Sequence, residues 1–500
     1  MRRLLYHLFL PLALTAHGAN PPVIHSRIGQ TTASADSSVV VTLQHKMQQF
    51  NWNDKATLDQ DIFSPKSVNI HPNGKKFYVN SLEGCATVVY EMDTWRKLKV
   101  IHHQFDEVRD SALWAKPSGL FPFRHYTRHL NTFSGKPVES AFSHGGRYLW
   151  VPYYRRTYDI NAQDPSAMAI IDTQTDSIVR MMETGPLPKM VACSHDGRFM
   201  AVSHWGDNTV ALVNIEGNDP KAWHYEKLFI IDYQLKLNLS MTQSVNRDVN
   251  SGYTLRGTVF TPDDRYLLVG CMGGGGGIAV IDMQSMEYIG RVLGMMSNVR
   301  HLIINDGWLY LSINGGGYVQ RIRLDAFLEA ARQMKDHKGR IDGWENCKVL
   351  GGARTIEASP TGHYIFAACN AGSKLCVVDT RTMKMIAQAD VDSYPVGLDI
   401  SKDGQTVITT SQGRSNGGGN AVNIFAVHYA DSAEVPVVTE TQEDAEAQVV
   451  PQAPASNAQG TTGKTEPESS SLPFGLIGGA AAVAVIVPLA FYFKKKGHDS

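Results

Sequence analysis

Cysteine is scarce in this chain of 500 residues, which contains only six. They are Cys85, Cys193, Cys271, Cys347, Cys369 and Cys376. No Cys-x-x-Cys or Cys-x-x-Cys-His motif occurs among them, so the sequence signals neither a zinc ribbon nor an attached c-type haem. Cys369 and Cys376 flank a predicted hairpin loop and are the best candidates for a disulfide, with buried free thiols as the alternative.

Metal and nucleotide motifs are equally rare. No His-Glu-x-x-His pattern occurs, and the glycine run from Gly273 to Gly277 lacks the lysine, the hydroxyl residue and the helix of a phosphate-binding loop. His125 and His129 have the i, i+4 spacing that could hold a metal ion on a helix, but no third ligand stands out. The sequence therefore predicts no cofactor and favours a protein that is not an enzyme.

Net charge is almost absent, because 47 Lys and Arg residues balance 48 Asp and Glu residues. This average hides strong local differences. Residues 430–471 are rich in Glu, Gln, Ser, Thr, Ala and Pro and contain almost no aromatic residues. Such a segment cannot bury enough apolar surface to fold, so we expect a disordered acidic tether there.

Long hydrophobic runs occur only at the two ends of the chain. At the start, Arg2 and Arg3 precede an apolar stretch from Leu4 to Leu14 and the small-x-small sequence Ala16-His17-Gly18. These features predict a secretory signal peptide over residues 1–18, and a short N-terminal anchor is the alternative.

The C-terminal run is longer. Residues 473–493 carry no charge, have the length that a bilayer requires and are followed by Lys494-Lys495-Lys496. Lysines of this kind stay in the cytoplasm. We therefore expect an exported, membrane-anchored protein with a transmembrane helix over 473–493 and a cytoplasmic tail over 494–500. The bulk of the chain would lie on the periplasmic or extracellular side.

Between these ends the chain repeats one phrase seven times, a tight polar turn between two apolar runs. The turns begin at His71, Ser143, Ser194, Thr261, Asn305, Ser359 and Ser401. Around each turn, four short strands fit into about 40 residues, which is typical of one propeller blade. The pattern predicts an all-β, seven-bladed β-propeller of four-stranded antiparallel blades over residues 64–429.

Three segments carry a resemblance to a known family. They are Lys76-Phe77-Tyr78-Val79-Asn80, Asp207-Asn208-Thr209-Val210 and the run from Pro395 to Gly404. Together they resemble the YVTN-type, YncE-like β-propeller family over roughly residues 64–427. The resemblance implies a closed seven-bladed ring in an exported protein. Relatives include ligand-binding surface proteins and some redox-associated propellers.

The last blade contains only three strands before the tether begins. Its outer strand must therefore come from the partly disordered N-terminal segment, residues 19–63, because closing the ring removes an open sheet edge. Val39 to Leu43 and Asp61 to Phe63 are the two candidates.

Nearly all long or glycine-rich insertions fall on one face of the predicted ring. They include residues 105–137, 154–166 and 235–254, which are rich in aromatic and basic side chains. An exception is the segment 325–346, whose apolar residues have helical spacing and predict a helix packed on the propeller side. Long loops on a rigid scaffold are a usual place for binding, and tolerated surface insertion is the alternative.

Cations recur at the start of the predicted inner strands, facing the same long-loop face. They are Lys66, Lys189, Arg256, Arg300 and Arg354, and the loops of that face add Arg124, Arg128, Arg155, Arg156, Arg414, Tyr126 and Tyr154. Clustered cations in a concave mouth attract anions. Alternatively, Glu139, Glu357 and Asp399 on the same strands could neutralise them.

Two functions remain open at this stage. The first is an envelope propeller that binds an anionic ligand, an envelope polymer or a partner protein through its long-loop face. The second is a propeller enzyme or redox-associated subunit, lactonase-like or cofactor-binding, with its site in the channel mouth. Nucleic acid is not expected as a partner of an exported protein, and the sequence carries no signal for an oligomeric state.

Overall fold

A computed structural model describes residues 23–50, 55–126, 128–240, 243–414 and 417–430 of the chain. The predicted signal peptide, acidic tether, transmembrane helix and cytoplasmic tail lie outside these described residues. Within them, no helix is both long enough and apolar enough to cross a membrane.

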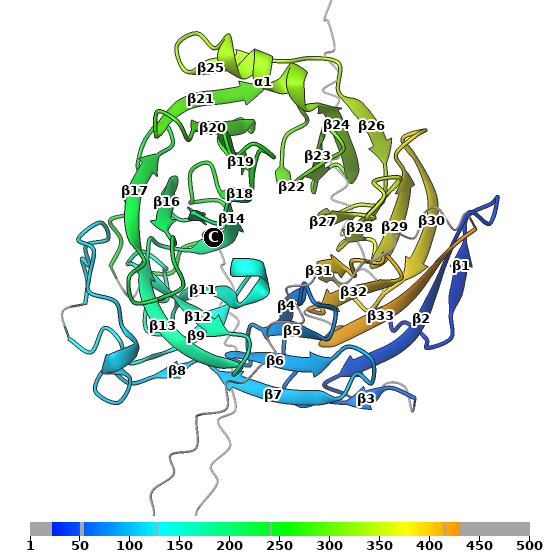
Figure 1. Ribbon diagram of the computed structural model, residues 1–500, viewed down its shortest axis with the longest axis horizontal. Coiled ribbons are helices and arrows are strands. Elements are labelled where there is room, and N and C mark those ends of the chain that lie inside the picture. Colours follow the sequence, from blue (N-terminus) through cyan, green and yellow to red (C-terminus); the bar gives the residue numbers. More distant parts are fainter. Residues whose placement is uncertain (1–22, 51–54, 127, 241–242, 415–416, 431–500) are drawn as a thin grey trace, which may run out of the picture. The chain divides into compact units, whose positions relative to one another are not determined.

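Seven antiparallel sheets surround a central axis, which Figure 1 views end-on. In the first six sheets the chain runs outward from the axis to the rim, whereas in the seventh the N-terminal strands lie at the rim. The predicted all-β, seven-bladed propeller with four-stranded blades is confirmed.

The first three blades share this plan, although the inner edge of the second blade is split between β9 and β10 and extended by β8 (Gln104–Phe105). From the axis outward, their strands are β4 (Pro65–Ile70), β5 (Lys76–Ser81), β6 (Ala86–Glu91) and β7 (Lys97–His102); β9 (Phe133–Pro137) and β10 (Ala141–Ser143), β11 (Tyr148–Arg156), β12 (Ser166–Asp172) and β13 (Ser177–Thr184); and β14 (Pro188–Cys193), β15 (Phe199–His204), β16 (Thr209–Asn214) and β17 (His224–Ile230). Two single-turn 3-10 helices, η1 (Ser111–Leu113) and η2 (His144–Gly146), lie in the connections.

The next three blades repeat the arrangement. Their strands are β18 (Leu255–Phe260), β19 (Tyr266–Cys271), β20 (Ile278–Asp282) and β21 (Glu287–Leu293); β22 (Val299–Asn305), β23 (Trp308–Ile313), β24 (Tyr318–Arg323) and β26 (Glu345–Lys348); and β27 (Ala353–Ala358), β28 (Tyr364–Cys369), β29 (Lys374–Asp379) and β30 (Lys384–Asp390).

The seventh blade joins the two ends of the propeller. Its inner strands are β31 (Pro395–Ile400), β32 (Thr406–Ser411) and β33 (Ala421–Tyr429), and the N-terminal strand β2 (Val39–Gln48) pairs antiparallel with β33. Strand β1 (Thr31–Ala33) extends this sheet outward, and β3 (Thr57–Leu58) pairs parallel with β2. The first of the two predicted closing segments thus forms the outer strand, whereas residues 61–63 form no strand.

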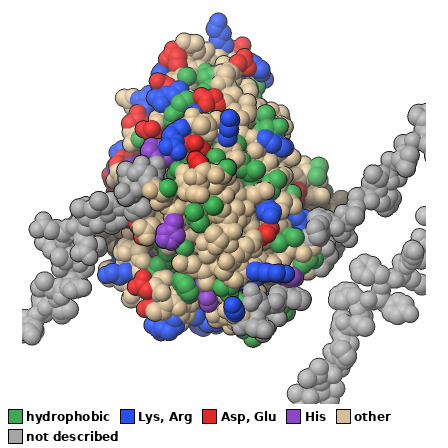
Figure 2. Space-filling view, turned by 90° about the vertical axis from the view of Figure 1, so that its right-hand side faces the viewer, with side chains coloured by type: hydrophobic (Ala, Val, Ile, Leu, Met, Phe, Trp, Pro, Cys, Tyr) green, Lys and Arg blue, Asp and Glu red, His purple; other side chains and the backbone are tan. Residues whose placement is uncertain are grey.

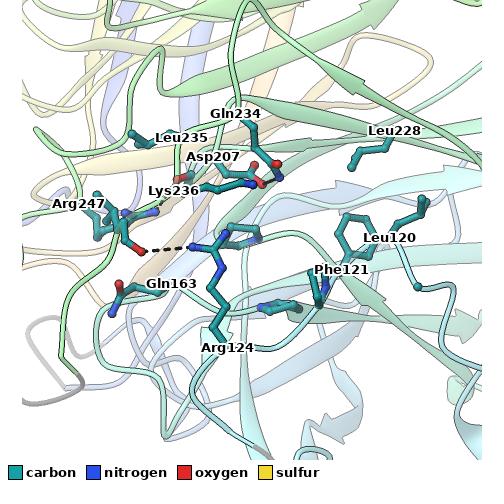
Figure 3. Close-up of a pocket in the computed structure, with 16 residues that line it drawn as sticks. Leu120, Phe121, Arg124, Gln163, Asp207, Leu228, Gln234, Leu235, Lys236 and Arg247 are labelled. Atoms are coloured by element: carbon teal, nitrogen blue, oxygen red, sulfur yellow. Dashed lines mark hydrogen bonds between the residues drawn. The ribbon is translucent and has the colours of Figure 1, made fainter.

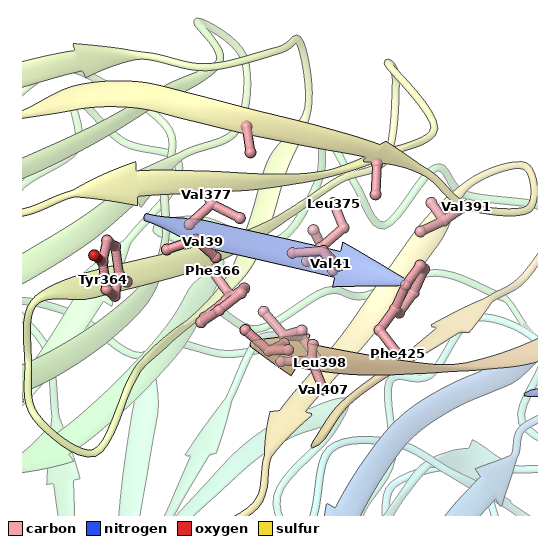
Figure 4. Close-up of a cluster of buried hydrophobic side chains, with 14 of the residues drawn as sticks. Val39, Val41, Tyr364, Phe366, Leu375, Val377, Val391, Leu398, Val407 and Phe425 are labelled. Atoms are coloured by element: carbon pink, nitrogen blue, oxygen red, sulfur yellow. The ribbon is translucent and has the colours of Figure 1, made fainter. Parts of the chain in front are cut away.

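Apolar side chains of the closing strand fill the space between the sixth and seventh blades. Val39, Val41 and Leu43 alternate along β2 and are fully buried against Phe366 and Phe425 (Figure 4). The alternation places every second side chain on the same face of the sheet. Closure therefore supplies hydrophobic core as well as backbone hydrogen bonds.

A buried ion pair fixes the same strand farther along, beyond the bulge between Leu43 and His45. Lys46 Nζ lies 2.8 Å from Asp392 Oδ2, and both side chains have an exposed fraction of 0%. The Asp392 carboxylate also accepts hydrogen bonds from Ser26 Oγ at 2.7 Å and from Asn423 Nδ2 at 3.1 Å. The pair ties the N-terminal segment to the loop between the sixth and seventh blades.

The helical insertion lies where the sequence predicts it. Helix α1 (Leu324–Arg332) follows β24 and buries Phe327 and Ala331 against the fourth and fifth blades. Strand β25 (Lys338–Arg340) then pairs parallel with β21 and adds a fifth strand to the fourth blade. The insertion therefore covers the rim.

The outer wall of the ring offers a mixed surface. On the side that carries β30 and β1, shown in Figure 2, hydrophobic side chains lie singly or in small groups between acidic and basic ones. Scattered apolar residues of this kind are normal for a protein surface. The interior of the ring is the more informative region.

The ion pair of the closing strand generates a stability prediction. We expect Lys46→Met to lower the free energy of unfolding by about 3–5 kcal/mol, because Asp392 keeps a buried charge without its partner. The double variant Lys46→Met/Asp392→Asn should recover part of this loss. Equilibrium denaturation measures both.

The exposed i, i+3 pair between Arg332 and Glu329 on α1 supplies the control. Arg332→Met should cost less than about 1 kcal/mol, as is usual for surface pairs. Equal losses at Lys46 and Arg332 would contradict the role of the buried pair in ring closure.

Candidate functional site: the mouth of the channel

In six of the seven blades, the inner strand carries the same irregularity near its start. The pairing with the second strand shifts by one residue, so that one residue of the inner strand has no partner opposite it. The unpaired positions fall at Lys66, Lys189, Arg256–Gly257, Arg300, Arg354 and Val396. A β-bulge of this kind redirects a side chain. Five of the six bulges thus carry the predicted cations.

Four of these cations line one open cavity of about 730 Å³ at the mouth of the channel. Its full lining is Lys66, Leu82, Glu83, Lys136, Tyr154, Arg155, Lys189, Trp205, Asp248, Thr254, Met272, Gly273, Asn298, Arg300, Asn314, Arg354, Tyr394 and Gln412. Most non-cationic residues of this list come from loops that join second to third strands or one blade to the next. The three long insertions of the long-loop face belong to the same two classes of loop.

The fifth cation, Arg256, lies deeper and pairs with a carboxylate. Its guanidinium contacts Glu139, which comes from the second blade and also lies 3.8 Å from Lys66 Nζ. Burial opposes the charge of Glu139, but Arg256 and Lys66 outweigh it and hold the pKa of Glu139 well below its usual range. Glu139 therefore neutralises one of the five cations.

Lys66 shares Glu139 with Arg256, whereas Lys189, Arg300 and Arg354 form no ion pair with a carboxylate among the described residues. Arg354 is only 4% exposed. Within the part of the chain that the structure describes, the Nε atoms of Arg354 and Arg300 have no hydrogen-bond partner. Burial lowers the pKa of Arg354 to about 10 and holds the pKa of Lys66 and Lys189 well below the usual range for lysine. Unpaired donors of this kind lose the hydrogen bonds that water would offer.

Aromatic rings form part of the same mouth. Lys189 Nζ lies 3.9 Å from the ring centroid of Tyr154 and 5.4 Å from that of Trp205. Arg256 and Arg300 also lie within 6 Å of the Trp205 ring. Cation–π contacts partly compensate lysine and arginine for lost water, but they add no negative charge.

Two acidic residues farther along the inner strands do not neutralise the cations. Glu357 lines a smaller cavity of about 70 Å³ together with Glu139 and Arg256. Burial, reinforced by Asp399, raises the pKa of Glu357, and burial raises the pKa of Asp399 to about 7. Asp399 accepts hydrogen bonds from the backbone N–H groups of Ile70 at 2.6 Å and Ile400 at 2.8 Å.

The structure brings two predicted loop residues, Tyr154 and Arg155, into the mouth. Arg155 donates hydrogen bonds to the carbonyls of Thr157 and Asp159, so its head group is held at the rim.

Arg156 does not lie where the sequence predicts it. Its side chain lies outside the mouth and is 2% exposed. It donates to the carbonyls of Leu130 and Pro165 and packs against the rings of Trp114 and Phe133. Strand β11 runs on to this residue, so the side chain holds the insertions together rather than facing a ligand.

The remaining predicted loop residues do not join the cation cluster. Arg124 lines a separate cavity, and Arg128 is exposed. Tyr126 donates from its hydroxyl to the carbonyl of Tyr158 at 2.7 Å. Arg414 donates to the carbonyl of Ala371 at 2.6 Å. These side chains support loops around the mouth.

Trp205, Tyr394 and Asp248 line the mouth but were not singled out from the sequence. Trp205 stands in the loop between β15 and β16, and Tyr394 directly precedes the inner strand of the seventh blade. Each of the three residues lies in a loop between second and third strands or between two blades. Their position in the repeat could therefore have predicted that they line the mouth.

The predicted metal pair does not share one helix face. The described residues around His125 and His129 form no helix, and the two rings contact different carboxylates, Asp164 at 3.0 Å and Glu107 at 2.9 Å. The described part of the chain contains no group of three His, Cys, Asp or Glu residues that could hold a metal ion.

Cys369 and Cys376 are free, buried thiols on neighbouring strands, and their sulfurs lie 3.6 Å apart. This distance exceeds the S–S bond length of about 2.05 Å. The structure therefore contains two free thiols at these positions, the alternative to the predicted disulfide.

The sequence contains one pattern that is typical of hydrolases. The run 413–417 reads Gly-x-Ser-x-Gly, which in hydrolases places a nucleophile between a strand and a helix. Here the run lies in the connection between β32 and β33, two antiparallel strands. The motif therefore lacks the surroundings that give it a catalytic meaning.

Comparisons with known proteins bear on the fold. No protein-family model matches the chain, and no curated protein sequence matches it. A solved structure described as Kuenenia stuttgartiensis hydrazine synthase has a TM-score of 0.51 at 12% identity, over 76% of this chain and 99% of that one. The β-propeller domain of Myceliophteria thermophila Cps50 (Swd1) has a TM-score of 0.49 at 12% identity, over 73% and 97%. At this identity, the likeness to the first of these structures shows a shared fold alone.

The acidic pair generates a pH prediction. The pKa of Glu357 is higher in the folded protein than in the unfolded chain. Over a range of pH the side chain is therefore protonated when folded and ionised when unfolded. Its raised folded pKa therefore costs stability as pH rises from about 4.5 through neutrality, by up to about 1.4 kcal/mol per pH unit. Relative to Glu357→Gln, wild-type stability should fall over this range. Denaturation at a series of pH values measures the difference.

The exposed residue Glu287 at the start of β21 provides a matched control. The curve of Glu287→Gln should run parallel to that of the wild type. If the curve of Glu357→Gln is parallel as well, Glu357 is ionised in the folded protein and our assignment is wrong.

Proposed function

We propose that this protein is a binding or scaffold propeller whose channel mouth holds a compact anionic ligand. The uncompensated positive charge at the repeated bulges supports the proposal. Guanidinium groups suit carboxylate and phosphate oxygens, and a partly enclosed mouth strengthens the attraction. The ligand would be a small anion or the acidic group of an envelope polymer or partner protein.

Arg354 carries the argument. Its guanidinium is buried, lines the open mouth and has an Nε without a partner in the described part of the chain. Folding removes this group from water without providing an acceptor for that donor, which costs free energy unless something else supplies one. An oxyanion in the mouth would supply that acceptor, together with charge for Lys66, Lys189 and Arg300.

The proposal also includes a cellular location. The signal-like residues 1–18 and the uncharged run 473–493 favour a propeller tethered to a membrane at the cell envelope. In this proposal the acidic residues 430–471 connect the propeller to the membrane-spanning run.

An enzyme is the second candidate, because the mouth contains two lysines whose pKa burial depresses, Lys66 and Lys189. A neutral amine in a cavity can act as a base or a nucleophile. A lactonase-like or cofactor-dependent reaction in the mouth would use them. Time-dependent modification of Lys189 by a carbonyl substrate under reducing conditions would favour this candidate.

Arg354→Met separates binding from stability. Without ligand, the variant should gain about 1–2 kcal/mol of unfolding free energy, because a buried charge surrounded by like charges is replaced by an apolar side chain. Its affinity for pyrophosphate or citrate should fall by about tenfold or more, because a charge-assisted hydrogen bond is lost. Calorimetric titration at fixed ionic strength measures the affinity.

Arg340→Met is the control, since Arg340 is exposed on β25 and pairs only with Asp342 among the described residues. It should change neither quantity. If the wild type binds none of sulfate, citrate and pyrophosphate, or if Arg340→Met weakens binding as much as Arg354→Met, the proposal fails.

A further inference from the structure

Three insertions that lie far apart in the sequence fold together beside the second and third blades. Arg124 Nη1 of the first insertion donates to the carbonyl of Leu237 in the third at 3.3 Å. Gln163 of the second insertion exchanges two hydrogen bonds with the backbone of Leu239, at 3.0 and 3.1 Å. The backbone N–H of Arg124 also donates to Asp164 at 3.0 Å. The insertions thus form one structure of their own.

Beneath these contacts lies a cavity of about 370 Å³, which we call the loop pocket (Figure 3). It is lined by Gly119, Leu120, Phe121, Pro122, Arg124, Gln163, Pro165, Pro186, Gly206, Asp207, Leu228, Gln234, Leu235, Lys236, Leu237 and Arg247. It shares none of these residues with the mouth of the channel. Its volume is within the range of small-molecule sites.

The two ends of the loop pocket differ in chemistry. Figure 3 shows Leu120, Phe121 and Leu228 at one end, whereas Arg124 and Arg247 lie toward the other. A cavity with an apolar body and a few convergent polar groups is the usual form of a small-molecule site.

Arg247 is the most informative group at the polar end. It is 7% exposed and donates to the carbonyls of Gly206 at 2.7 Å and Asn250 at 3.1 Å. Its Nε has no partner among the described residues. The backbone contacts fix the guanidinium, and one buried donor is left for a ligand.

Asp207 limits where a charged head group can lie. It is 4% exposed, and its carboxylate accepts hydrogen bonds from Thr209 Oγ1 at 2.7 Å and Gln234 Nε2 at 3.2 Å. Burial raises its pKa to about 6, so it is mostly ionised at neutral pH. An acidic head group would therefore be repelled by Asp207 and attracted toward Arg124 and Arg247.

We infer that the loop pocket binds a small amphipathic acid, with its carboxylate at Arg124 and Arg247 and its apolar body against Leu120, Phe121 and Leu228. The site is independent of the anion site in the mouth. An apolar chain of about eight carbons suits a cavity of this volume. The insertions then act as a binding module added to one side of the propeller.

The test uses the full chain in lipid nanodiscs and octanoic acid that carries a diazirine on its terminal carbons. After irradiation, we expect mass spectrometry to find label in peptides covering residues 119–124 and 228–237. Unlabelled octanoate should compete for this labelling in a saturable manner, whereas octanol should compete about tenfold less well, because it cannot make the charge-assisted bonds.

Matched variants assign the site. Arg124→Glu should reduce the labelling by about tenfold, because it places a like charge beside the carboxylate. Arg128→Glu makes the same change on the same insertion at an exposed position outside the pocket and should alter labelling less than about twofold. Leu235→Trp fills the pocket and provides a second disruption if Arg124→Glu does not fold, as judged by circular dichroism.

Arg354→Met separates this inference from the proposal for the mouth and should leave the labelling unchanged. Label that is spread over the surface, label that octanoate does not displace, or equal effects of Arg124→Glu and Arg128→Glu would overturn the inference. Loss of label in Arg354→Met would assign the acid to the mouth instead and would overturn the separate site.

Discussion

Pairing between β2 and β33 is the interaction on which the rest of the structure depends. It makes the ring continuous, because the last blade has only three strands of its own and would otherwise end in an open edge. Apolar side chains of β2 fill the space between the sixth and seventh blades, and the Lys46–Asp392 pair holds the strand beyond its bulge. Only a closed ring brings bulged residues from all sides to one channel mouth.

The cation cluster works against the stability that closure provides. Among the described residues, Glu139 is the one carboxylate that forms ion pairs with the five buried or partly buried basic groups, and Glu357 and Asp399 hold their protons far more tightly than ordinary acids do. Such an arrangement costs folding free energy in the absence of a counter-charge. Natural proteins retain destabilising arrangements of this kind mainly at functional sites. The conflict between stability and charge is the strongest physical reason to place function in the mouth.

Much of the fold and part of the site could be predicted from the sequence, and each success has a local cause. Seven turn motifs defined the blades, and the missing fourth strand of the last blade indicated closure by the N-terminal segment, with residues 39–43 and 61–63 as the two candidates. The misplacement of Arg156 has a tertiary cause, since the burial of that side chain depends on contacts with residues of the insertions 105–137 and 154–166. The raised pKa of Glu357 also has a tertiary cause, because it comes from burial of the side chain. The convergence of distant insertions on the loop pocket has no sequence period that could have revealed it.

The repeated bulge has a consequence for the symmetry of the ligand field. Because a bulged residue has no partner across the ladder, its side chain can differ from blade to blade while the strand pairing stays the same. Four adjacent blades, the third to the sixth, carry cations there. Lys66 of the first blade stands apart from them, between the seventh blade, which carries Val396, and the second blade, which lacks this bulge. The potential is therefore displaced from the axis toward one half of the ring. A ring of sevenfold pseudosymmetry thus acquires a direction, and an anion with two unlike ends would enter it in one orientation.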